Sequence, residues 1–229
     1  NFKMIDKRQF YISGMWTDPI VKNDFEVINP SNENSYAVIS LGSEKDVNLA
    51  VNAAKDAFIS WSHFDKKEKI YLLENLLKIY KSRWDDITHT MSEEMGAPLD
   101  WSSSAQTSSG ADHINDFILR LKNFEFEKRF NKNSNNYIVY EPIGVCGLIT
   151  PWNWPINQIT LKVIPALATG CTMILKPSEI APMSGIIFAE IIHEAGFPPG
   201  VFNLVNGDGE GVGTDLSSHK DIDMISFTG

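Results

Sequence analysis

The sequence predicts an α/β fold built on a parallel sheet, preceded by short strands and helices. In the last third of the chain, apolar runs of strand length alternate with stretches of helical periodicity. Gly170 and Gly196 each follow a helical stretch, where helices commonly end. Strand–helix–strand units of this length form parallel sheets with right-handed crossovers. The expected strands are 145–150, 171–176, 201–205 and 224–227, and the expected helices are 155–168, 183–195 and 209–216.

The first part of the chain is expected to hold short strands and then several helices. Ser43 and Asp46 have the spacing of a capping box, so a helix should begin there. Gly96 and Pro98 stop a later helix. A serine-rich stretch from residue 102 is expected to be helical as well. The expected strands lie near 10–12, 25–28 and 38–41, and the helices at 47–61, 70–80, 84–95 and 102–121.

A β-hairpin is expected at residues 124–141, between these helices and the parallel sheet. Residues 124–127 and 137–140 alternate in polarity, and residues 131–136 form a polar turn. An exposed hairpin with aromatic residues is either an association element or an ordinary surface hairpin, and the pattern leaves both open. The expected parts of the chain are therefore 1–123, 124–141 and 142–229.

Composition excludes several classes of partner. Twenty basic and 29 acidic side chains give a net charge of −9, which disfavours nucleic-acid binding. A dinucleotide remains compatible, because local backbone dipoles can hold it. Two cysteines suit a reducing compartment, and their spacing fits no zinc pattern, so no metal is expected. No apolar run reaches the length of a membrane span and no signal peptide is evident, so we expect no membrane partner and a cytoplasmic location.

Three polar clusters follow three of the expected parallel strands: residues 150–153, 176–179 and 206–213. In an open parallel sheet, ligands bind outside the carboxyl ends of the strands. Because the three clusters share that edge, they predict one common site.

Asn153 lies between two tryptophans and two prolines. Proline fixes the backbone and removes N–H donors, so the carboxamide would be held in a stiff frame. A preorganised amide of this kind can stabilise a developing oxyanion. Alternatively, Asn153 caps the following helix, which is a common role for asparagine.

Lys176 and Glu179 follow the second parallel strand. A dinucleotide-binding sheet places an acidic side chain there to accept hydrogen bonds from ribose hydroxyls, and a lysine can donate to them. Alternatively, the two form a surface ion pair at a helix start.

The glycine-rich run 207–213 is a weak phosphate-loop signal, because Val212 occupies the sixth position of G-x-G-x-x-G. Cys146 and Cys171 fall in expected strands, where a buried thiol is far commoner than a nucleophile.

Several longer runs closely resemble the aldehyde dehydrogenase superfamily. They are long, specific and in order, and weaker similarity extends to the N-terminal strands and helices. The runs are 141–155 (EPIGVCGLITPWNWP), 165–171 (PALATGC), 175–179 (LKPSE), 194–203 (EAGFPPGVFN) and 226–229 (SFTG).

The resemblance implies the N-terminal, cofactor-binding portion of an incomplete aldehyde dehydrogenase fold. Residues 1–123 would be strands and helices of the cofactor-binding domain, 124–141 the oligomerisation hairpin, and 142–229 a Rossmann-like NAD-binding core. The family's nucleophilic cysteine and general-base glutamate come after the motif that begins Phe227-Thr228-Gly229. The catalytic domain is therefore expected to be absent, and the chain alone to be inactive.

The resemblance also assigns roles to individual residues. Asn153 would stabilise the oxyanion of a cysteine thiohemiacetal. Glu179 favours NAD because a carboxylate opposes a 2′-phosphate, although Lys176 and Ser178 leave NADP open. The implied cofactor-binding residues are Ile149, Thr150, Pro151, Trp152, Lys176, Ser178, Glu179, Gly209, Gly213 and Gly229, with Trp154 and Leu161 facing substrate and Lys162 supporting Asn153.

These expectations define a function and an alternative. The first is NAD-dependent oxidation of an aldehyde to a carboxylic acid by a homodimer or homotetramer, to which this segment contributes the cofactor cleft. The alternative is a truncated, inactive product that only binds a dinucleotide or serves as an oligomerisation module.

Overall fold

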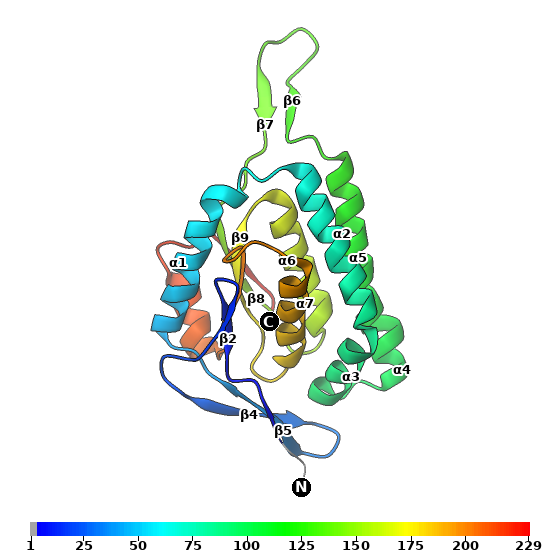
Figure 1. The fold of residues 1–229 in the computed structure, drawn as a ribbon, viewed down its shortest axis with the longest axis vertical. Coiled ribbons are helices and arrows are strands. Elements are labelled where there is room, and N and C mark those ends of the chain that lie inside the picture. Colours follow the sequence, from blue (N-terminus) through cyan, green and yellow to red (C-terminus); the bar gives the residue numbers. More distant parts are fainter. Residues whose placement is uncertain (1–3) are drawn as a thin grey trace.

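A six-stranded sheet forms the centre of the computed structural model, which describes residues 4–229 (Figure 1). The strand order is β11-β8-β9-β10-β2-β3, and the first four strands in that order run parallel. This confirms the predicted α/β class. The predicted strand at 10–12 is confirmed as β2, and with β3 it adds an antiparallel extension beside β10, a pairing that the sequence did not predict. The strands are β2 (Phe10–Ile12), β3 (Met15–Thr17), β8 (Val145–Ile149), β9 (Thr172–Lys176), β10 (Phe202–Leu204) and β11 (Met224–Phe227).

β8, β9 and β10 are buried along their whole length, and each side of the sheet has its own core. Along β8, Val145 and Ile149 belong to one apolar cluster, whereas Cys146 and Leu148 belong to the other. This follows from the two-residue period of a strand, which sends successive side chains to opposite faces. Strands buried on both faces show continuous apolar runs, as the sequence does.

Helices cover both faces of the sheet (Figure 1). α1 (Glu44–Trp61) and α8 (Thr214–Ser218) form one core together with the strand residues that point to their face of the sheet. α6 (Pro155–Thr169) and α7 (Met183–Ala195) pack on the other face. α2 (Lys66–Ser82) and α5 (Ser108–Asn123) pack on these two helices and form an outer layer.

The predicted helix starts and stops are confirmed at several positions. The Ser43 backbone N–H donates to Asp46 Oδ2 over 2.8 Å, so the capping box that begins α1 is present. α3 (Trp84–Met95) ends at Gly96, which has a left-handed backbone. The serine-rich stretch is helical, but it continues from α4 (Leu99–Trp101) as the π-helix η1 (Ser102–Thr107).

Two smaller sheets lie outside this core. β4 (Asp24–Asn29) and β5 (Asn34–Ser40) are antiparallel, and β1 (Ile5–Asp6) pairs with β5 in parallel. The predicted hairpin is confirmed as β6 (Glu127–Arg129) and β7 (Tyr137–Val139), which project beyond the helices at one end of the molecule (Figure 1). Its paired part is shorter than expected.

The order of the strands reverses once, and this reversal positions the site. The chain runs from β8 through α6 to β9 and through α7 to β10. It then returns through the π-helix η2 (Gly209–Gly213) and α8 to place β11 on the other side of β8. Open α/β sheets bind ligands at such a reversal, outside the carboxyl ends of the strands. Of the helices within 4–229, none is both long and apolar enough to cross a membrane.

Candidate functional site

A cavity of about 310 Å³ opens where the strand order reverses. Ile149, Lys176 and Phe227 line it from the carboxyl ends of β8, β9 and β11. The segment that returns from β10 forms the remaining wall. That wall consists of Gly209, Gly213, Thr214, Ser217 and Ser218. We call this space the switch-point cavity. It brings together four of the residues predicted to bind a cofactor.

Lys176 is the charged group of the switch-point cavity. Its side chain is 4% exposed, and its Nζ donates to the Gly207 carbonyl over 2.6 Å and to the Pro177 carbonyl over 3.1 Å. Burial lowers the pKa of Lys176, while Glu179 opposes that shift. Lys176 and Glu179 do form the ion pair considered as an alternative, but the lysine of that pair is buried rather than at the surface.

Glu179 is the predicted ribose acceptor, and it lies 3.5 Å from Lys176 Nζ. Its side chain is about a quarter exposed (26%), so its carboxylate can still accept hydrogen bonds from a ligand. The Ser178 hydroxyl accepts a hydrogen bond from the Ile180 backbone N–H within the same loop. Ser178 thus shapes the loop, while Lys176 and Glu179 supply the two charges.

The glycine-rich segment forms a π-helix rather than an ordinary phosphate loop. Asp208 caps it by accepting a hydrogen bond from the Gly211 N–H over 2.7 Å, so this carboxylate is engaged with the backbone. A Cβ at Gly213 would lie 3.7 Å from Lys176 Cε, and one at Gly209 would meet no atom within 4 Å. Because glycine at 213 has no Cβ, it leaves space beside Lys176 for a ligand that lies along this wall.

The residues of this edge fit a dinucleotide. Thr150 Oγ1 and the Asn206 carboxamide are buried polar atoms at the ends of β8 and β10 that have no hydrogen-bond partner within the described chain. Buried polar groups are almost always satisfied by protein, water or ligand. With the buried lysine and the glycine wall, these atoms give the edge the donors and acceptors that sugar hydroxyls and phosphates need.

Asn153 lies between β8 and α6, on an exposed stretch of backbone. The N-cap of α6 is Trp154, and no side chain caps the helix, so the alternative role of Asn153 as a helix cap is wrong. Trp154 packs edge-on against Trp101 with 5.0 Å between ring centroids. Pro151 is half-buried, whereas Trp152 is 52% exposed. Asn153 is thus an exposed side chain that does not cap the helix that follows it.

Leu161 and Lys162 line a second cavity of about 360 Å³, separate from the switch-point cavity. Lys162 Nζ donates to the Ser226 hydroxyl of β11 over 2.9 Å, and burial lowers the pKa of this lysine. Cys146 and Cys171 line the same cavity as free, buried thiols, as the sequence predicted. Leu161 and Lys162 therefore lie on a different cavity from Lys176.

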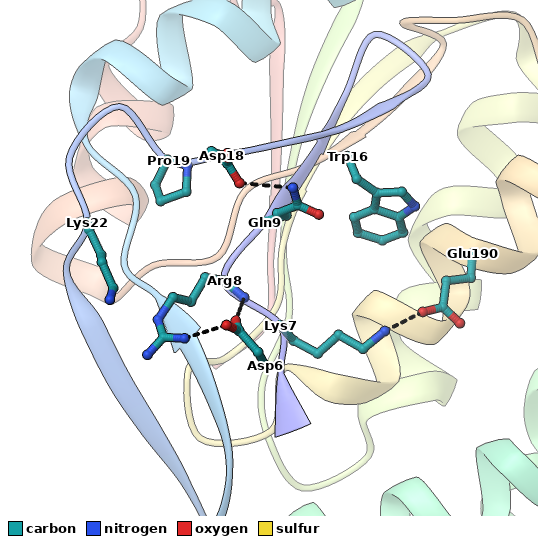
Figure 2. A pocket seen from close by; sticks show the side chains of 9 residues that line it. All are labelled: Asp6, Lys7, Arg8, Gln9, Trp16, Asp18, Pro19, Lys22 and Glu190. Carbon is teal, nitrogen blue, oxygen red and sulfur yellow. Dashed lines mark hydrogen bonds and ion pairs between the residues drawn. The ribbon is translucent and has the colours of Figure 1, made fainter. Parts of the chain in front are cut away.

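A larger cavity, about 540 Å³, lies elsewhere, beside the N-terminal segment (Figure 2). Its charges are already paired: Lys7 with Glu190 at 2.7 Å, and Arg8 with Asp6 at 2.6 Å. We call it the N-terminal cavity. Because its polar groups are satisfied by one another, it is the weaker candidate despite its size. Within 4–229 no three His, Cys, Asp or Glu side chains cluster as metal ligands would.

Sequence reasoning missed Thr214, Ser217, Ser218 and Phe227 as lining residues. The signal was present in part, because a helix that follows a glycine loop after a strand faces the same crevice. Ser217 and Ser218 lie one turn beyond Thr214, so the same face of α8 presents them.

The chain belongs to the aldehyde dehydrogenase family, whose sequence pattern it matches over residues 16–229. Among individual relatives, it is 50% identical to a 3-succinoylsemialdehyde-pyridine dehydrogenase of a Pseudomonas species, over 99% of this chain and 47% of that protein. The chain thus spans about half the length of the curated relatives it matches.

Solved structures agree with the fold. The aldehyde dehydrogenase of Bartonella henselae superposes with a TM-score of 0.96 at 53% identity, over 98% of this chain and 47% of that one. A variant of aldehyde dehydrogenase C from Pseudomonas syringae, complexed with NAD+ and octanal, gives 0.93 at 42% identity, over 95% and 44%. An aldehyde dehydrogenase of Bacillus cereus in complex with NAD+ gives 0.92 at 32% identity, over 99% and 46%. These matches confirm the predicted N-terminal portion of the family fold.

Proposed function

We propose that this chain is the NAD-binding portion of an enzyme that oxidises an aldehyde to a carboxylic acid. The observation that carries the proposal is the switch-point cavity, which gathers Ile149, Lys176, Gly209 and Gly213 at the reversal of strand order. The NAD+ complexes of the structural relatives support the choice of cofactor.

The residues of the cavity would bind and orient the dinucleotide. Lys176 and Glu179 would hold the ribose hydroxyls, one as donor and one as acceptor. Ile149, Thr150, Pro151 and Trp152 would border the cleft, and Gly229 would lie at its far side beyond β11. The carboxylate of Glu179 would repel a 2′-phosphate, which favours NAD over NADP. When bound, NAD+ would accept the hydride.

Asn153 would act on the substrate rather than the cofactor. Its exposed amide would donate to the oxygen that becomes negative when a thiolate adds to the aldehyde carbonyl. Trp154 and Leu161 would border the substrate, and Lys162, held by Ser226, would support the same region. The nucleophile itself would come from outside these 229 residues, because both thiols of this segment are buried. Alone, the chain would therefore bind cofactor without turning over.

The alternative function is an oligomerisation module without catalysis. Phe130, Tyr137 and Val139 of the projecting hairpin are 64%, 49% and 56% exposed, which leaves an apolar surface for a second copy. In the intact protein this surface would build a homodimer or homotetramer. The two unpaired thiols fit the proposed cytoplasmic location.

Calorimetric titration of the 229-residue chain with NAD+ and NADP+ tests the proposal, together with an assay for NADH in the presence of aldehyde. We expect saturable NAD+ binding, weaker NADP+ binding and no NADH. Replacing Glu179 with Gln should reduce the preference for NAD+ over NADP+. Failure of the folded chain to bind either dinucleotide would overturn the proposal, and NADH formation would overturn the inactivity of the chain.

A further inference from the structure

Glu94 is a buried carboxyl group on the last turn of α3, and it lies far in sequence from the residues it contacts. It is 1% exposed. Its Oε2 accepts a hydrogen bond from the Met183 N–H over 2.6 Å, and its Oε1 accepts one from the Ser184 N–H over 3.0 Å. The Ser184 hydroxyl donates to the same carboxyl group. All three donors belong to the first turn of α7.

These contacts replace a cap that α7 lacks locally. Its N-cap residue is Pro182, and no side chain of the N-cap accepts a bond from the helix. The first N–H groups of a helix need outside acceptors, and a carboxylate also matches the positive end of the helix dipole. Glu94 therefore caps α7 from a position 89 residues earlier in the chain.

The helix start that Glu94 holds is one end of the loop that carries Glu179. The loop runs from Pro177 to Pro182, between β9 and α7. At its other end, Lys176 is fixed by the hydrogen bond to the Gly207 carbonyl. Because the loop is short and begins and ends with proline, its path depends on both attachments. The position of Glu179 is therefore set partly by Glu94.

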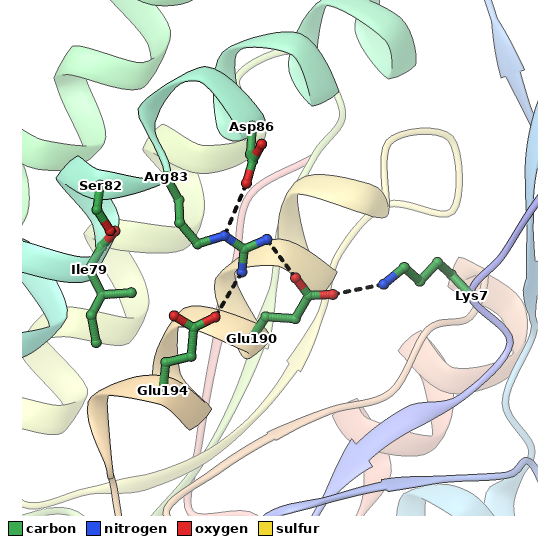
Figure 3. A network of polar contacts seen from close by, with 7 residues as sticks. All are labelled: Lys7, Ile79, Ser82, Arg83, Asp86, Glu190 and Glu194. Atoms are coloured by element: carbon green, nitrogen blue, oxygen red, sulfur yellow. Dashed lines mark hydrogen bonds and ion pairs between the residues drawn. The ribbon is translucent and has the colours of Figure 1, made fainter.

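A second group of contacts joins α3 to α7 at a distance from this loop (Figure 3). Arg83, at the start of α3, pairs with Glu190 at 2.8 Å and with Glu194 at 3.3 Å in the second half of α7. α3 thus holds α7 at two places, and the one at Glu94 lies where the loop that carries Glu179 ends. Because both contacts join the same two helices, a variant at Arg83 is a matched control for a variant at Glu94.

We propose that Glu94 is a positioning residue for the cofactor, which holds the 177–182 loop so that Glu179 can reach the ribose. This inference rests on the proposed binding of NAD. Glu94 does not touch the ligand in this scheme. It acts through the backbone N–H groups of Met183 and Ser184.

The test compares NAD+ affinity and amide exchange among variants of the 229-residue chain. Glu94→Gln keeps the shape but can satisfy only one of the two N–H groups, and Ser184→Ala removes the hydroxyl contact alone. We expect Glu94→Gln to raise the Kd for NAD+ about tenfold, the size of one lost hydrogen bond, and Ser184→Ala to raise it less. Arg83→Ala, the matched control, should lower the melting temperature but change the Kd less than about twofold, since α7 remains capped.

Hydrogen exchange reports on the loop without any ligand. The amides of Met183 and Ser184 should exchange at least about tenfold faster in Glu94→Gln than in the unchanged chain, and Arg83→Ala should leave them protected. If folded Glu94 variants have normal NAD+ affinity and normal amide protection, the positioning role of Glu94 is overturned, while the proposed function is not. An unchanged chain that does not bind NAD+ would instead overturn the proposed function, and with it the ligand named here. If Glu94→Gln does not fold, normal affinity in Ser184→Ala would count against the inference.

Discussion

The switch-point cavity and the N-terminal cavity differ in how their charges are satisfied. The N-terminal cavity is larger, about 540 Å³ against 310 Å³, and it holds more charged residues. Yet its charged side chains face one another in ion pairs, such as Lys7 with Glu190 (Figure 2). In the switch-point cavity the buried lysine bonds backbone carbonyls, and Thr150 Oγ1 nearby on the same edge has no partner.

This difference shows why size and charge alone identify a site poorly. Charged groups that already pair with one another offer a ligand few free donors or acceptors. Where the strand order reverses, the strand ends bring together backbone groups and side chains that the fold leaves free to bind a ligand. If that comparison is correct, equivalent substitutions in the two cavities should have unequal effects on ligand binding.

The largest effect is expected at Asn153, on the substrate side of the switch-point edge. In an intact enzyme that contains this segment, Asn153→Ala should lower kcat by about two to three powers of ten, as loss of one oxyanion donor does. Steady-state kinetics checks this, with Asn123→Ala, at an exposed helix end, as the matched control. Turnover equal to that of the control would remove the role assigned to Asn153.

A matched pair of lysines comes next. Lys176→Met should weaken NAD+ binding by about tenfold or more, because the ribose loses a charged donor. Lys7→Met removes the same charge from the N-terminal cavity and should leave the Kd unchanged. Calorimetry on both variants measures the difference. Equal losses from the two changes would contradict the assignment of the switch-point cavity.

A smaller effect is expected from a single methyl group. Gly213→Ala places a Cβ 3.4 Å from the Asp208 carbonyl oxygen and 3.7 Å from Lys176 Cε, which the fold can accept. Because that methyl group enters the cavity wall, it should weaken NAD+ binding severalfold without lowering the melting temperature. Gly209→Ala, whose Cβ meets no atom within 4 Å, shows whether any methyl group on this segment has the same effect. Tighter binding by Gly213→Ala would show that the ligand does not lie along this wall.

The smallest effects are in stability, and they have opposite signs at two glutamates. Burial raises the pKa of Glu94 from 4.5 to about 7, although Ser184 and Met183 oppose the shift. Tyr36 lies near both Glu94 and Glu93, and its pKa is itself raised, first by burial, so it stays neutral. Since the folded chain binds the proton of Glu94 more tightly, the free energy of unfolding falls as the pH rises from about 4.5 to about 7.

Glu190, in the N-terminal cavity, behaves in the reverse way. Burial pushes its pKa up, but Lys7 and Arg83 outweigh burial, so the pKa is lowered. Its contribution to stability is present above the unfolded pKa and is lost as the pH falls. Urea unfolding from pH 4 to 8 measures the free energy of unfolding of each variant. For Glu94→Gln this free energy should approach that of the unchanged chain as the pH rises, and for Glu190→Gln it should approach it as the pH falls. Parallel curves for the two variants would contradict both assignments.

The parallel sheet and its clusters could be predicted because they depend on local patterns. Apolar runs indicate β8 to β11, and glycines indicate the ends of α6 and α7. The polar clusters come directly after the strands in the sequence. The capping of α7 by Glu94 could not be predicted, because no local pattern links residues 89 apart. The strand at 10–12 was predicted, but its pairing with β10 could not be, since only tertiary contacts decide which sheet a short strand joins.

The pairing of β2 with β10 also has a consequence for how the chain folds. Tyr11 lies opposite Leu204, so the first strands of the sheet find their neighbour only after most of the chain exists. Contacts between such distant residues slow folding, and unpaired strands invite aggregation in the meantime. During synthesis, β2 and β3 could pair with each other, but β2 would lack its second neighbour until β10 has emerged from the ribosome.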